Sequence, residues 1–148
     1  MFTLESSAFG NGESIPKKYT GQGADVSPPL AWSDAPENTQ AYALICEDPD
    51  APRPKPWVHW LLANIPGAKR ELAEGEDAGA VAGKTDFGKA GYGGPMPPSG
   101  HGTHHYHFTL YALDGTLDVS QGASKEDFEQ AMTGHVLDKA ELVGTYER

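Results

Sequence analysis

The sequence contains a single cysteine, Cys46, so it can form no intrachain disulfide. No segment approaches the ~20 apolar residues that a membrane-spanning helix needs, so we expect no transmembrane segment. Residues 1–16 lack a basic region followed by an apolar stretch, so no signal peptide is expected either. Because Cys46 lies in an apolar run that suits burial in a reducing compartment, we expect a cytoplasmic location.

Positive charge is also scarce. The chain has 11 Lys and Arg residues against 21 Asp and Glu residues, which gives a formal net charge of −10. Such a charge argues against binding to nucleic acid or to anionic membrane surfaces. Signatures of metalloenzymes and serine hydrolases are missing, since there is no HExxH motif, no cysteine pair and no GxSxG elbow around Ser99. We therefore expect no cofactor, and no residue is assigned a catalytic role.

The length and the turn-forming residues indicate one β-rich domain over residues 1–148. The 18 glycines and 12 prolines are spread along the chain, as in short strands joined by turns. Strands are predicted at residues 41–47, 58–64, 104–113 and 140–146, with weaker candidates at 2–6 and 30–32, and residues 71–90 are expected to form a surface loop.

One helix is well indicated near the end of the chain. Ser124 can act as its N-cap, and Phe128 and Met132 then lie on one face. Gly134 is a plausible end, although the helix could resume through residues 135–138. The pattern predicts a mainly β domain, a β-sandwich with one or two short peripheral helices.

The first of two polar motifs is DPDAPRPKPWVHW at residues 48–60. Asp48 has the strand parity of Cys46, so it should point inward, where a carboxylate needs a partner or a raised pKa. His59 shares a predicted strand face with Leu61. Each residue also has a structural explanation, because aspartates in such turns cap their own backbone and a histidine among aromatics can be a satisfied core residue.

The second motif is GYGGPMPPSGHGTHHYHF at residues 91–108. Its glycines allow close backbone approach to a ligand, and their free amides can bind an anion. Because strand side chains alternate, His104 and Tyr106 share one face, and His105 and His107 should point to solvent on the other. The first face suggests the floor of a polar pocket that grades into core.

Two further hypotheses use the same residues. Asp48, His59 and His104 would make a two-histidine, one-carboxylate set suited to zinc or iron. The same three side chains could instead supply acid–base groups for a hydrolysis. His101 lies in the loop before them, either at the pocket entrance or as an ordinary solvated residue.

Together the motifs resemble the phosphatidylethanolamine-binding protein family. DPDAP precedes a Trp-x-His strand, and GPMPPSG precedes His-x-Tyr-x-Phe; the closer similarity is to the bacterial Raf-kinase-inhibitor-like branch. Residues 25–32 and 134–148 also resemble that branch, so the resemblance covers nearly the whole chain. It implies an antiparallel β-sandwich of two sheets with a small cavity near one edge, which binds phosphate-like and other small anions.

The resemblance also implies which residues form the cavity. Its expected lining and supporting residues are Asp48, His59, His104, Tyr106, Asp50, Pro52, Trp57, Tyr92, Gly94 and Pro98. One position departs from the family, which usually has arginine where this chain has His105. We expect His105 to hold nearby structure less strongly than an arginine and in a pH-dependent way.

These observations predict a protein that binds small anions or phosphoryl groups, with a regulatory or inhibitor-like role; the alternative is a hydrolase that uses the same Asp/His pocket. The expected partner is a small anion such as phosphate or a phosphorylated head group. A kinase or protease follows by family analogy alone, and a homodimer is a further hypothesis.

Overall fold

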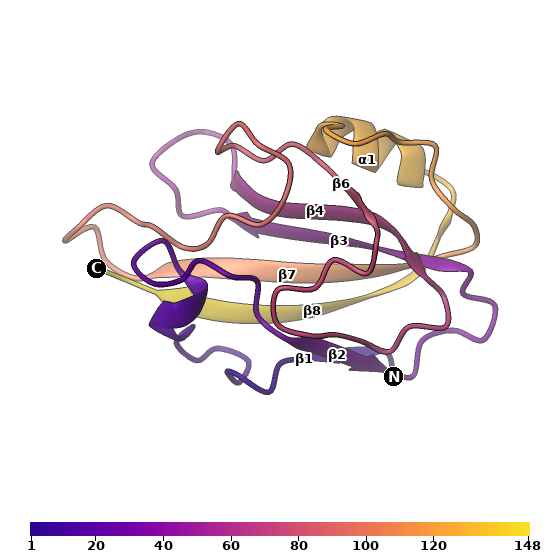
Figure 1. Cartoon of the computed structure of the whole chain (residues 1–148), viewed down its shortest axis with the longest axis horizontal. Helices are drawn as coiled ribbons and strands as arrows, with labels where there is room; N and C mark the ends of the chain where they lie inside the picture. Colours follow the sequence, from indigo (N-terminus) through magenta and orange to yellow (C-terminus); the bar gives the residue numbers. More distant parts are fainter.

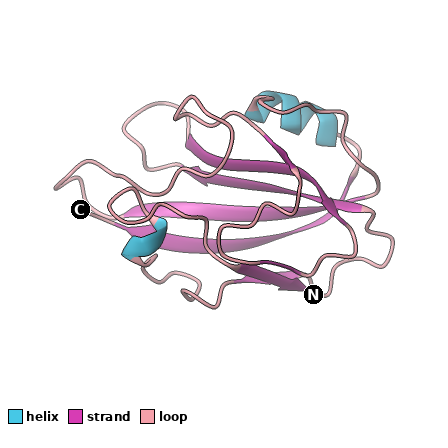
Figure 2. Cartoon of the chain, in the orientation of Figure 1, coloured by secondary structure: helices cyan, strands magenta, loops and turns pink.

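A computed structural model describes residues 1–148 as two packed antiparallel sheets with one α-helix (Figures 1 and 2). The elements in chain order are β1 (Thr3–Glu5), the 3-10 helix η1 (Lys17–Tyr19), β2 (Leu30–Ser33), β3 (Ala41–Asp48), β4 (Trp57–Pro66), β5 (Glu71–Leu72), β6 (Val81–Ala82), β7 (His104–Leu113), α1 (Lys125–Met132) and β8 (Val136–Tyr146). The smaller sheet has the order β1-β2-β5, and the larger has the order β6-β4-β3-β7-β8.

Two apolar clusters hold the layers together. The larger cluster lies between the sheets and joins Leu4 and Trp32 of the small sheet to Phe108 of the large one. The second cluster packs Leu61, on the opposite face of the large sheet, against Phe128 of α1. Figure 1 shows this layering, with β1 and β2 on one side of the large sheet and α1 on the other. Full burial of a leucine or phenylalanine side chain contributes about 1.5–3 kcal/mol to stability. The two clusters therefore hold the large sheet between the small sheet and α1.

The predicted mainly β sandwich with short helices is confirmed, although some boundaries were wrong. The last strand begins at Val136 rather than at residue 140, so the helix does not resume beyond Gly134. Gly134 has φ +81°, a conformation that ends helices and favours glycine. Residues 71–90 are not merely a loop, because β5 and β6 lie within them at sheet edges. Two-residue strands are too short to produce a periodic sequence signal.

A β-bulge in β4 changes which residues face the space between the sheets. Cys46 pairs with Trp60 and Glu47 pairs with Val58, so one step along β3 spans two steps along β4, with His59 as the extra residue. The expectation that His59 and Leu61 share a face was therefore wrong. Leu61 packs toward α1, whereas the bulge directs His59 to the other side of the sheet.

Candidate ligand-binding site

The polar residues of the two motifs meet at one end of the large sheet. β3 finishes at this end of the sheet, and its antiparallel neighbours β4 and β7 begin there, on the left of Figure 1. This arrangement brings together Asp48, His59, His104 and Tyr106, which are 3%, 3%, 2% and 1% exposed. Four polar side chains buried at one sheet end are a strong departure from an apolar core.

A cavity of about 210 Å³ opens beside these side chains. Its walls are formed by Asp48, Ala51, Pro52, Trp57, His59, Phe87, Met96, Pro97, Pro98, His104 and Tyr106. Most of the residues expected from the sequence lie on this wall. Asp50, Tyr92 and Gly94 do not, while Ala51, Phe87, Met96 and Pro97 were not anticipated.

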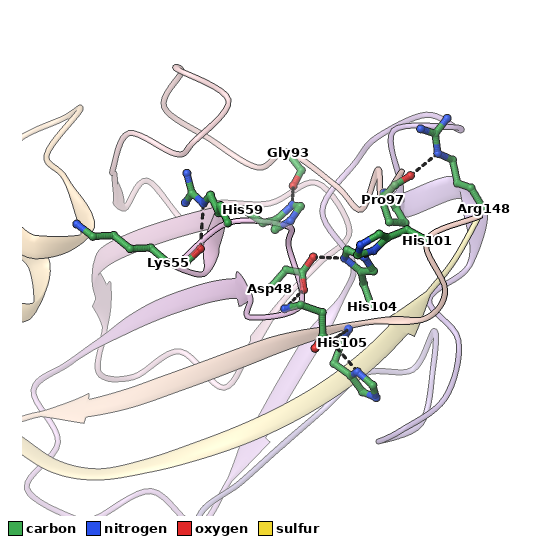
Figure 3. A network of polar contacts seen from close by, with 11 residues as sticks. Asp48, Lys55, His59, Gly93, Pro97, His101, His104, His105 and Arg148 are labelled. Atoms are coloured by element: carbon green, nitrogen blue, oxygen red, sulfur yellow. Dashed lines mark hydrogen bonds and ion pairs between the residues drawn. The ribbon is translucent and has the colours of Figure 1, made fainter. Parts of the chain in front are cut away.

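A chain of three hydrogen-bonded side chains runs from the buried wall toward solvent (Figure 3). The Nδ1 atom of His104 lies 2.7 Å from Oδ2 of Asp48, and its Nε2 atom lies 2.6 Å from Nδ1 of the exposed His101. The other carboxylate oxygen, Oδ1, accepts from the backbone N–H of Asp50 at 2.8 Å. Asp48 therefore caps its turn and also holds an imidazole through its second oxygen.

The second buried imidazole, His59, has a defined tautomer. Its Nδ1 lies 2.7 Å from the carbonyl oxygen of Gly93, which can only accept, so Nδ1 carries the hydrogen. Burial lowers the pKa of His59, although the Gly93 carbonyl and the Asp48 carboxylate oppose that shift. The ring lies edge-on to Tyr106 and Phe87, with centroids 5.1 and 5.3 Å away. His59 is thus a neutral imidazole whose Nε2 has no partner within the protein.

The hydroxyl of Tyr106 is the clearest sign of a ligand. It is fully buried and makes no hydrogen bond. Burial, reinforced by the charge of Asp48, raises the pKa of Tyr106, so the group stays a neutral phenol that can donate. A buried polar group without a partner costs about 1–3 kcal/mol, and native structures normally satisfy such groups with protein, water or ligand.

Asp50 supports the site from outside the cavity. Its Oδ2 accepts from both the backbone N–H and the Nδ1 of His105, each at 2.8 Å. Partial burial opposes ionisation, but the bonds from His105 prevail and lower the pKa of Asp50. His105 therefore ties the turn after β3 to the start of β7.

Tyr92 and Gly94 hold the loop that leads into β7. The Tyr92 hydroxyl donates to the carbonyl oxygen of Tyr19 at 2.7 Å, and the Gly94 N–H donates to Oδ1 of Asp25 at 2.7 Å. A Cβ atom at Gly94 would lie 2.3 Å from the Tyr19 carbonyl oxygen, so only glycine fits. Both residues act by positioning backbone rather than by lining the cavity.

The mouth of the cavity is apolar. Phe87 and Met96 line it while 41% and 44% exposed. Phe87 is the only aromatic residue of the 71–90 segment, and this was the one feature of the sequence that could have singled it out as a cavity residue. Trp57 is covered by the guanidinium of Arg53, 4.7 Å from its ring centroid, which in turn pairs with Asp86 at 2.5 Å. No lysine or arginine is among the lining residues.

The hypothesis of a zinc or iron site is not supported by the side-chain geometry. No group of three or more His, Cys, Asp or Glu side chains is arranged to hold a metal ion. Both carboxylate oxygens of Asp48 accept hydrogen bonds within the protein, and Nε2 of His104 lies against His101, so only His59 has an unpaired atom to offer a metal.

Fold and cavity place the chain among antiparallel β-sandwiches with a cavity at one end of the larger sheet, beside buried polar side chains. The profile of the phosphatidylethanolamine-binding protein family matches residues 5–147, and the chain belongs to that family. A UPF0098 protein of Methanothermobacter thermautotrophicus is 49% identical over 98% of both chains. One from Pyrococcus horikoshii is 47% identical over 97% of this chain and 75% of its own length.

Solved structures agree with this assignment. A phosphatidylethanolamine-binding protein homologue from Chlamydia trachomatis superposes with a TM-score of 0.94 at 44% identity, covering 99% of this chain and 97% of that one. Escherichia coli YbcL gives 0.92 at 34% identity, with 99% and 98% covered. The family and the two-sheet fold predicted from the motifs are thus confirmed. None of the helices is long and apolar enough to span a membrane.

Proposed function

We propose that the protein binds a small oxyanion, such as phosphate or a phosphorylated head group, in the cavity beside His59, His104 and Tyr106. The observation that carries the proposal is the buried, unpartnered Tyr106 hydroxyl, which needs an acceptor. The cavity of about 210 Å³ is smaller than the ~300–1,000 Å³ typical of drug-sized pockets, which favours a small group.

The surrounding residues have complementary roles in this proposal. Tyr106 donates its O–H to an oxygen of the anion, and Asp48 holds the His104 ring in place. The apolar mouth around Phe87 and Met96 accommodates whatever the phosphoryl group is attached to. Supporting residues such as Asp50 and Gly94 keep the two loops in register.

Replacing a single hydroxyl tests this proposal. Tyr106→Phe removes the donor, so we expect phosphate affinity, measured by equilibrium dialysis with radiolabelled phosphate, to fall about tenfold. Stability against urea should stay the same or rise by about 1 kcal/mol, because a buried unpaired group is removed.

Tyr42→Phe is the matched control. The Tyr42 hydroxyl is also buried without a partner, but it lies in the core between the sheets and away from the cavity. Its loss should change stability similarly and leave phosphate binding intact. Equal affinity losses in both variants, or no phosphate binding by the unmodified protein, would contradict the proposal.

A regulatory or inhibitor-like role toward a kinase or protease, exercised in the cytoplasm, extends the proposal. It is supported by the exposed apolar side chains of Phe87 and Met96, which a protein carrying the anion could cover. Size-exclusion chromatography with light scattering would separate such a complex from the proposed homodimer. A monomer that retains no partner from a lysate would count against both.

Hydrolysis is the second candidate, and the Asp48–His104–His101 chain is the observation that favours it. A carboxylate that orients one imidazole, which in turn contacts an exposed imidazole, resembles the arrangement of a general base. A panel of phosphoester and carboxyl-ester substrates would reveal turnover. Activity lost in His104→Ala and retained in His107→Ala would establish the enzyme, whereas no turnover would eliminate it.

A further inference from the structure

The cavity contains almost no fixed positive charge to balance an anion. Its 11 lining residues include no lysine or arginine, and Asp48 is the only acidic side chain among them. Arg53 lies outside the wall, and Asp86 neutralises it. Burying an anion beside a carboxylate without a compensating cation is costly, so positive charge must enter with the ligand.

The free ring nitrogen of His59 presents a lone pair rather than a hydrogen, whereas both ring nitrogens of His104 already have partners. His59 donates through Nδ1 to Gly93, which leaves Nε2 as an acceptor. His104 donates through Nδ1 to Asp48, and its Nε2 accepts from His101 when the ring is neutral. An anionic oxygen placed against Nε2 of His59 would be repelled unless a hydrogen lies between the two atoms.

The surroundings of His59 reinforce this point. The charges that act on it are all negative, from Asp48 on β3 and from Asp86 and Asp25 in loops, and the group facing it from β7 is the neutral Tyr106 phenol. Burial makes the free ring give up its proton, and an anion at Nε2 would reverse that balance by favouring the charged ring. A hydrogen bond between Nε2 and the ligand oxygen also forms if the ligand itself carries the hydrogen.

We infer that the cavity binds an oxyanion together with one proton, so that its ligand class is a phosphate or phosphate monoester in the monoanion form, with the shared proton between His59 Nε2 and a ligand oxygen. This inference rests on the proposed anion binding and specifies the protonation state. Proton-free anions such as sulfate can enter only when an imidazole supplies the hydrogen.

Calorimetry of inorganic phosphate and of methyl phosphate measures the proton directly. At pH 8, where these ligands are mainly dianions, titrations in two buffers of different ionisation enthalpy should show uptake of about one proton per ligand bound. Apparent affinity should fall about tenfold per pH unit above pH 7. Binding without proton exchange would overturn this inference and leave the proposed function standing, whereas no binding at any pH would overturn the proposed function.

Sulfate provides the second arm, because it cannot carry the proton near neutral pH. We expect sulfate to bind at least tenfold more weakly than phosphate at pH 7.5, and the gap to narrow toward pH 5.5 as the imidazole gains its hydrogen. His107→Gln, at a histidine outside the cavity, should behave like the unmodified protein. Equal and pH-independent affinities for phosphate and sulfate would contradict the inference.

Discussion

Two Asp–His pairs join the same two segments of the chain, yet they lie in opposite environments. Asp48 and His104 meet at 2.7 Å with side chains that are 4% and 2% exposed. Asp50 and His105 meet at 2.8 Å with side chains that are 41% and 50% exposed. Because the contact distances are almost equal, burial is the main difference between the two pairs: the first lies beside the cavity and is shielded from water, whereas the second is exposed and ties a turn to a strand.

Breaking the buried pair should have the largest effect. Asp48→Asn removes the charge that His104 faces, so we expect a loss of about 3 kcal/mol in the free energy of unfolding. Urea denaturation would measure this loss. Asp50→Asn is the matched change in the exposed pair and should cost no more than about 1 kcal/mol. Similar losses in both variants would remove the contrast.

A pH series separates buried from exposed histidines. The pKa of His59 is lowered from 6.5 by burial, so the unfolded chain binds its proton more readily than the folded one. Stability should therefore fall as the pH drops below about 6.5, by up to about 1.4 kcal/mol per unit until the folded ring also titrates. His59→Gln, whose amide can still donate to Gly93, should flatten this dependence.

The control for that series is His107→Gln, since His107 is only half-buried and lies outside the cavity. It should retain the slope of the unmodified protein between pH 7 and pH 5. A slope that survives in His59→Gln would show that another group titrates in this window.

The exposed pair should give the smallest change. His105→Arg places a permanently charged guanidinium opposite Asp50, and we expect it to raise stability by about 0.5 kcal/mol at pH 8. Although partial burial opposes the shift, hydrogen bonds from His105 lower the pKa of Asp50 from 3.8, so the stabilisation by the ionised carboxylate is present above about pH 4 and is lost as the pH falls through the folded value. Urea midpoints measured at pH 8 and below pH 4 would show the gain and its loss. An arginine variant less stable than the unmodified protein at pH 8 would contradict the prediction.

The sequence predicted what alternation and local motifs determine. In β7, His104, Tyr106 and Phe108 are buried while His105 is exposed, as a period of two requires. The inward parity of Asp48 in β3 is likewise observed, since it is 3% exposed. These residues lie on a regular strand, where each side chain's direction follows from its neighbour's.

The features of the site that the sequence did not predict depend on contacts between residues distant in sequence. The bulge at His59 arises from pairing between β3 and β4, and no pattern within β4 reveals it. Phe87 and Met96 reach the cavity from loops whose paths are set by tertiary contacts. His101 lies in the loop before β7, and its contact with His104 depends on the path of that folded loop.

The central claim is that an oxyanion binds beside His59 and His104, and side-chain histidine NMR tests it most directly. Titrating the protein with inorganic phosphate at pH 6.5 should move the imidazole resonances of His59 and His104 along saturable curves that give one dissociation constant. The resonances of His107 and His135, which lie outside the cavity, should stay in place. Small, non-saturating shifts spread over all six histidines would contradict the account.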